Sequence, residues 1–139
     1  MENYLNPVLS DEEIERFSVL ALAYLGDGVF ELMARTHQAL LGGVTSRGLH
    51  RKTVGIVCAG TQAKASRMIK EELNEKELSI YQRGRNAKPK TIPKHSDRAD
   101  YSYATALEAL FGWLFLKGNI SRINELFHMV LQAGTEDVQ

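Results

Sequence analysis

Two acidic side chains, Asp27 and Glu108, are the residues of this chain best suited to chemistry. Each interrupts an otherwise apolar run, which extends from Val19 to Phe30 around the first acid and from Tyr103 to Leu116 around the second. A carboxylate in apolar surroundings is costly unless a cation or hydrogen-bond donors compensate it. Carboxylate oxygens are the ligands that a hard cation such as Mg²⁺ prefers. Two such acids on separate core helices therefore indicate one shared divalent metal.

Glycines lie beside both acids. Gly26 and Gly28 flank Asp27, and Gly112 follows Glu108 by one helical turn. A glycine in a helix interior costs about 1 kcal/mol relative to alanine. We therefore expect a metal, a phosphate or another helix to approach the backbone closely at these positions.

An alternative is that both acids are buried ion pairs with arginines, for example with Arg35 or Arg51. Glu31 lies one turn beyond Asp27 on the same face and could offer a further oxygen. A salt bridge from Glu31 to Arg35 is the favoured interpretation of that residue.

The elements that position these residues are expected to be helices. Residues 10–13 have the form of a capping box, which opens one helix, or two abutting helices, to about Leu41. Further helices are expected over about 45–57, 61–73, 74–85, 97–116 and 121–133. Residues 86–96 hold two prolines and three lysines and are expected to form a loop. The predicted fold class is all-α.

Composition favours one globular domain over residues 1–139, because 44% of the chain is hydrophobic. The single Cys58 cannot form an internal disulfide, so the cytoplasm is the expected location. No run reaches the roughly 18–20 apolar residues of a membrane span, since Asp27 interrupts the longest candidate. No membrane partner is therefore expected.

The zero net charge hides a basic middle segment. Residues 47–98 carry thirteen Lys/Arg and five Asp/Glu, whereas residues 1–46 carry two and seven and residues 99–139 carry two and five. This asymmetry is typical of a surface that binds a polyanion. A solvated basic face is the alternative.

Several motifs resemble those of the ribonuclease III family. Residues 24–30, Tyr-Leu-Gly-Asp-Gly-Val-Phe, resemble its signature helix, and residues 105–112, with Glu-Ala-Leu, resemble its second signature. Residues 83–88, Arg-Gly-Arg-Asn-Ala-Lys, and residues 101–110 are similar to Mini-ribonuclease III, the short bacterial branch that consists of the catalytic domain alone. The resemblance extends over about residues 20–134.

The resemblance implies a ribonuclease III endonuclease-domain-like helical fold that forms a two-fold homodimer without a double-stranded-RNA-binding domain. Asp27 and Glu108 would be the catalytic and metal-binding residues, with Mg²⁺ as cofactor and Mn²⁺ as the alternative ion. The implied activity is that of an endoribonuclease that cleaves double-stranded RNA, leaving 5′-phosphate and 3′-hydroxyl ends. Its implied role is to mature the ends of the large-subunit (23S) ribosomal RNA precursor.

The chain departs from longer relatives at two positions. Ala23 and Thr105 stand where those relatives have two further acids. Because Mg²⁺ keeps several waters in many sites, two carboxylates with water and phosphate oxygens could suffice.

The resemblance and the basic segment together indicate the RNA-binding residues. Double-stranded RNA is recognised mostly through its shape, phosphates and 2′-hydroxyls, so a basic loop is suitable. The predicted contacts are Arg83, Arg85, Asn86, Lys88, Lys90, Lys94 and Arg98. Six further basic residues either extend this surface or form a solvated face: Arg47, Arg51, Lys52, Lys64, Arg67 and Lys70. We expect the affinity for RNA to be modest and salt-dependent. A ribosomal protein already bound to the RNA could therefore assist binding.

A second copy of the chain is the expected protein partner, because one domain offers one site for two strands. The first predicted helix has more apolar surface than one helix face of a small monomer needs, although these residues could instead fill the core of the monomer. They are Val29, Phe30, Leu32 and Met33. Two other functions remain open. One is a non-catalytic RNA-binding ribosome-assembly factor, and the other is a helical scaffold whose acids are ion-paired.

Overall fold

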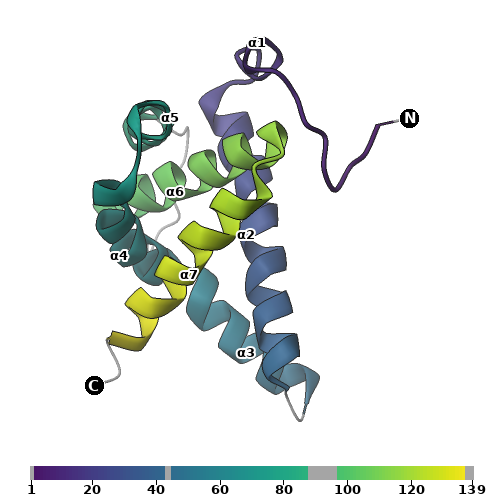
Figure 1. The fold of residues 1–139 in the computed structure, drawn as a ribbon. Helices are drawn as coiled ribbons and strands as arrows, with labels where there is room; N and C mark the ends of the chain where they lie inside the picture. Colours follow the sequence, from purple (N-terminus) through teal and green to yellow (C-terminus); the bar gives the residue numbers. More distant parts are fainter. Residues whose placement is uncertain (1, 43–44, 88–96, 137–139) are drawn as a thin grey trace.

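The structure, a computed structural model, describes residues 2–42, 45–87 and 97–136, and within these ranges it is all-helical (Figure 1). The all-α prediction is therefore confirmed for this part of the chain. In chain order the elements are α1 (Asp11–Ile14), α2 (Val19–Leu41), α3 (Ser46–Val57), α4 (Ala59–Ile69), the 3₁₀ turn η1 (Lys70–Glu72), α5 (Glu75–Asn86), α6 (Arg98–Lys117) and α7 (Ile120–Glu136). None of the described helices is both long enough and apolar enough to cross a membrane.

Local capping explains where the first helices begin and end. The Ser10 hydroxyl accepts a hydrogen bond from the Glu13 backbone N–H at 3.2 Å, and the Glu13 carboxylate accepts one from the Ser10 N–H at 3.1 Å. Ser18 then caps α2 by accepting from the Ala21 N–H at 3.1 Å. The expected capping box is thus confirmed, and it opens a short helix that abuts a separate longer one.

The other boundaries differ little from the predicted ones. Asn74 and Glu77 form a second capping box at the start of α5. The helix expected over 61–73 begins two residues earlier and ends in η1. Of the expected loop 86–96, Asn86 is the last residue of α5, and residues 88–96 lie outside the described ranges.

Helix α6 is the centre of the fold (Figure 1). It packs against α1, α2, α4, α5 and α7. Its buried residues, at positions 104–107, 109–114 and 116, surround the whole helix. A helix that is apolar on all sides belongs in a core, which explains the long apolar run around Glu108.

Helices α2 and α6 cross in direct backbone contact. A Cβ added to Gly26 would lie 1.7 Å from the Glu108 carbonyl oxygen, and one added to Gly112 would lie 2.0 Å from the Leu22 carbonyl oxygen. Of the three groups expected to approach the backbone here, namely a metal, a phosphate or another helix, it is another helix that does so at Gly26 and Gly112. At Gly28 an added Cβ would meet nothing within 4 Å.

Phe30 joins three helices in the core. Its ring is fully buried, and its centroid lies 5.5 Å from the Phe111 centroid in α6 and 5.5 Å from the Phe127 centroid in α7. The expectation that Phe30 belongs to a surface for a second copy is therefore wrong, because this residue fills the core of the monomer. Leu32, by contrast, is 56% exposed.

Candidate active site

The structure brings Asp27 and Glu108 together at the crossing of α2 and α6. Their carboxyl groups lie close enough to interact through charge and, when one of them is protonated, through a hydrogen bond. Glu108 is partly buried, whereas Asp27 is exposed on the surface of α2. The expectation that both acids have apolar surroundings is thus wrong for Asp27, because α2 exposes this position to solvent.

The environment of Glu108 favours its protonated form. Burial raises the pKa of its carboxyl, and the negative charge and hydrogen bond of Asp27 raise it further, to about 8. Two carboxylates in contact are unfavourable when both are ionised, because like charges repel. A divalent cation between them would relieve that repulsion.

The arginine alternative does not account for these acids. Arg35 instead donates to Glu31, with Nη2 and Oε1 3.0 Å apart and both side chains exposed, so the expected Glu31–Arg35 salt bridge is confirmed. In residues 2–42, 45–87 and 97–136, no ion pair joins Asp27 or Glu108 to a basic side chain.

The positions of the two missing acids offer no carboxylate ligand. Ala23 is buried and has no polar side-chain atom. Thr105 is also buried, and its hydroxyl donates to the Tyr101 carbonyl oxygen at 2.9 Å. No cluster of three or more His, Cys, Asp or Glu suited to a metal occurs among the described residues. The donor set is therefore two carboxylates, which fits Mg²⁺ provided that water and substrate oxygens complete its coordination.

The structure explains why a glycine, Gly84, lies between the two arginines of the Arg-Gly-Arg motif. A Cβ at Gly84 would lie 2.9 Å from the Ala106 Cα, so this side of α5 is pressed against α6. The two arginines point to different places. Arg83 borders a depression with Trp113, whereas Arg85 reaches Tyr103, whose hydroxyl lies 3.1 Å from Nη2.

Three of the predicted RNA-binding residues come together. Arg85, Asn86 and Arg98 line a hollow of about 440 Å³ between the end of α5 and the start of α6. Its other lining residues are Ala99, Ser102 and Tyr103. Arg83 is separate from this group, and the predicted contacts Lys88, Lys90 and Lys94 lie outside the described residues.

Tyr103 is a residue of this surface that sequence reasoning missed. It stands at the edge of an apolar run, where an aromatic side chain reads as part of the core. Its contact with Arg85 spans 18 positions. Arg85 belongs to α5 and Tyr103 to α6, so no local pattern marks this contact.

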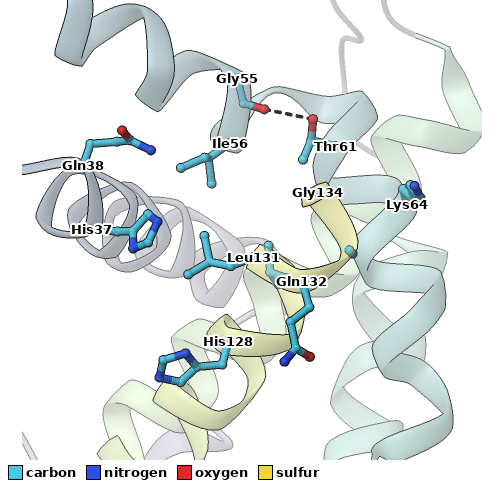
Figure 2. A pocket seen from close by; sticks show the side chains of 12 residues that line it. His37, Gln38, Gly55, Ile56, Thr61, Lys64, His128, Leu131, Gln132 and Gly134 are labelled. Carbon is cyan, nitrogen blue, oxygen red and sulfur yellow. Dashed lines mark hydrogen bonds between the residues drawn. The ribbon is translucent and has the colours of Figure 1, made fainter. Parts of the chain in front are cut away.

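A larger cavity, of about 530 Å³, lies elsewhere, between α2, α3, α4 and α7 (Figure 2). His37, Ile56 and Leu131 are among its lining residues, and the Thr61 hydroxyl donates to the Gly55 carbonyl oxygen at its edge at 2.9 Å. It contains neither acid of the pair and none of the seven predicted RNA contacts, although Lys64, one of the six further basic candidates, is among its lining residues. The pair of acids thus lies outside this cavity, at an open surface that a long polymer could reach.

Comparison with known proteins agrees with this geometry. Residues 20–119 match the family described as "Ribonuclease III domain". The chain is 33% identical over 137 residues to "Mini-ribonuclease 3" of Clostridium tetani, covering 98% of this chain and 91% of that one. It is 45% identical over 124 residues to "Mini-ribonuclease 3" of Desulfitobacterium hafniense, covering 88% and 78%. A crystal structure of a Fusobacterium nucleatum protein superposes with a TM-score of 0.78 at 31% identity, covering 86% of this chain and 96% of that one.

Proposed function

Because this chain belongs to the ribonuclease III family and is an endoribonuclease, we propose that it cleaves double-stranded RNA at Asp27 and Glu108 with Mg²⁺ as its cofactor. The observation that carries the proposal is the contact between these two carboxyl groups, which come from separate helices and lack a cationic partner among the described residues. Mn²⁺ is the proposed substitute ion. The expected products carry 5′-phosphate and 3′-hydroxyl ends.

Each acid has a separate part in this proposal. The exposed Asp27 carboxylate is accessible to a phosphodiester that approaches from solvent. The partly buried Glu108 carboxyl group is held by the central helix and would be ionised when it coordinates a cation. When bound, Mg²⁺ would supply Lewis acidity towards a phosphate oxygen and lower the pKa of a water nucleophile.

The active form is proposed to be a homodimer with two-fold symmetry, since one chain offers one carboxylate pair and a duplex has two strands. Apolar side chains that the monomer leaves exposed on α2 support a contact between copies. Leu20 is 42% exposed and Tyr24, one turn later, is 85% exposed. Sedimentation velocity tests this: a monomer at concentrations that support cleavage would contradict the dimer.

The proposed substrate is the precursor of large-subunit (23S) ribosomal RNA, in the cytoplasm, with a ribosomal protein as the proposed additional partner. This part of the proposal rests on the resemblance to Mini-ribonuclease III. Cleavage of precursor RNA with and without bound ribosomal proteins tests it, and cutting only at sites outside the precursor stems would contradict it.

The central test is cleavage of a long, end-labelled RNA duplex with Mg²⁺, with Mn²⁺ and with a chelator. Asp27→Asn and Glu108→Gln should each abolish cutting while circular dichroism shows a folded protein. Glu31→Gln is the matched control, because Glu31 lies one turn from Asp27 but is paired with Arg35. Duplex binding without cutting by the wild type in either metal would instead support a non-catalytic RNA-binding factor.

A further inference from the structure

Two arginines from different helices converge on one tyrosine. The Arg67 guanidinium carbon, from α4, lies 4.5 Å from the Tyr103 ring centroid, and that of Arg85, from α5, lies 4.6 Å from it. Tyr103 itself belongs to α6, and its hydroxyl accepts a hydrogen bond from Arg85 Nη2 at 3.1 Å. We call this cluster of Arg67, Arg85 and Tyr103 the arginine–tyrosine cluster.

Positive charge exceeds negative charge around this cluster. Asp100 Oδ1 lies 3.4 Å from Arg67 Nη2, and both side chains are partly exposed. The nearby Asp97 carboxylate caps α6 by accepting from the Ala99 N–H at 2.7 Å. Arg98 adds a third guanidinium to the hollow that Arg85 borders. Holding like charges near one another is unfavourable, so an anion bound there would be stabilised.

The titration of Tyr103 reports the same local potential. Burial alone would raise the pKa of its phenol, but the charge and hydrogen bond of Arg85, together with Arg67, outweigh burial and lower it. A site that favours a phenolate also favours other oxyanions, because the same cations stabilise both.

We propose that the arginine–tyrosine cluster is a preorganised binding site for one phosphate of the RNA backbone. This inference rests on the proposed function and adds Arg67 and Tyr103 to it. A guanidinium has five N–H donors, so Arg85 retains donors beyond the one given to Tyr103. Guanidinium groups bind phosphate through paired donors, and stacking on the ring reduces the side-chain entropy that binding would otherwise cost.

The fold holds the cluster in place. The Ser66 hydroxyl donates to the buried Tyr81 hydroxyl at 2.8 Å, and this joins α4 to α5 one residue before Arg67. Gly84 presses α5 onto α6 one residue before Arg85. The cluster is therefore built from positions whose backbones are fixed by neighbouring contacts.

The phosphate held here would differ from the one that is cut. Tyr103 precedes Glu108 by five residues on α6, which corresponds to about 7.5 Å along the helix axis and about 140° around it. The site would therefore position the duplex relative to the carboxylate pair rather than take part in bond cleavage. Arg67 and Arg85 are phosphate ligands in this scheme, and Tyr103 is a positioning residue.

The test measures duplex binding across a series of monovalent salt concentrations in the Glu108→Gln background, where cutting is expected to be absent. Arg67→Ala and Arg85→Ala should each reduce the slope of log affinity against log salt concentration by about one. Tyr103→Leu should weaken binding, whereas Tyr103→Phe, which retains the ring, should weaken it less. The matched control is Arg16→Ala. Arg16 is exposed, follows α1 and has no part in the cluster, although α1 itself packs on α6.

A second measurement needs no substitution in the cluster. Phenylglyoxal modification of Arg67 and Arg85, followed by mass spectrometry, should slow when duplex RNA is added, while modification of Arg16 should not. Duplex binding with salt slopes equal to that of Arg16→Ala, and without protection of Arg67, would overturn this inference and leave the proposed function standing. Absence of duplex binding by the folded Glu108→Gln parent and of cutting by the wild type would overturn both.

Discussion

Gly26 and Glu108 are in backbone contact, and the separation of the two acids depends on this contact. An added Cβ at Gly26 would lie 1.7 Å from the Glu108 carbonyl oxygen, a distance that no rotamer change can relieve. The residue next to Gly26 in sequence is Asp27, so the same contact that joins the two helices also places the two carboxyl groups together.

Gly26→Ala is therefore expected to destabilise the protein by at least about 2 kcal/mol, because α2 and α6 must separate to admit the methyl group. Urea denaturation measures the free energy of unfolding. Gly28→Ala is the matched control, since an added Cβ there meets nothing within 4 Å, and alanine should stabilise the helix by about 0.5–1 kcal/mol. Equal stability of the two variants would refute the close crossing.

Among the ion pairs of the described residues, the Arg122–Glu77 pair is expected to contribute most to stability. Arg122 Nε lies 2.8 Å from Glu77 Oε2, with the Glu77 side chain 2% exposed, and Arg122 also donates to the Glu72 carbonyl oxygen at 2.8 Å. Arg122→Ala should cost about 3–5 kcal/mol, because it leaves a buried carboxylate unpaired. Arg35→Ala, which breaks the exposed pair with Glu31, should change stability by no more than about 0.5 kcal/mol. Urea denaturation of the two variants side by side checks the difference.

Glu77 also predicts how stability changes in acid. Burial alone would raise the pKa of this carboxyl, but hydrogen bonds from Arg122 and the Asn74 N–H outweigh burial and lower it below 4.5. The folded state then binds this proton less readily than the unfolded chain does, so the stabilisation is present above pH 4.5 and is lost as the pH falls through the folded-state pKa. Glu77→Gln should show a smaller loss of stability on acidification than the wild type does. An unchanged acid profile would contradict the assignment.

Glu108 predicts the opposite dependence in the metal-free protein. Its folded-state pKa of about 8 exceeds the ordinary value of 4.5, so between these values the folded protein keeps a proton that the unfolded chain has lost. Its contribution to the free energy of unfolding is therefore fully present below pH 4.5 and decreases as the pH rises towards about 8. Denaturation in a chelator across this range should show the decrease in the wild type but not in Glu108→Gln.

The effect of Mg²⁺ on that titration follows from charge alone. A bound cation favours the ionised carboxylate, so the apparent pKa of Glu108 should fall when Mg²⁺ is added. The carboxyl ¹³C chemical shift of Glu108 measures this directly. A pKa that is unaffected at millimolar Mg²⁺ would argue against Glu108 as a ligand.

Much of the fold could be predicted because its signals are local. The capping boxes at Ser10 and Asn74 begin helices where the sequence predicts them. The different directions of Arg83 and Arg85 were also predictable, since residues two apart on a helix do not share a face. Charge alone places both residues in one set of RNA contacts, because a count of charges ignores helical phase.

Other features depend on packing between distant segments. Asp27 is exposed and Phe30 is buried in the same apolar run, and hydrophobic periodicity alone does not say which side of such a run meets another helix. The pairing of Glu77 with Arg122 spans 45 positions. Arg67 and Tyr103 likewise meet only when α4 and α6 pack together.

The glycine contacts between α2 and α6 have a consequence for how this site can change. Peptide groups have no alternative rotamers, so the distance between the helices at Gly26 and Gly112 cannot be adjusted gradually by exchanging one side chain for a slightly larger one. Any larger residue at either position would clash with the backbone of the other helix. Stepwise substitution therefore cannot lead to a wider spacing between α2 and α6. Selectivity for a different ion is therefore expected to evolve by replacing the acids themselves, while the scaffold that separates them stays the same.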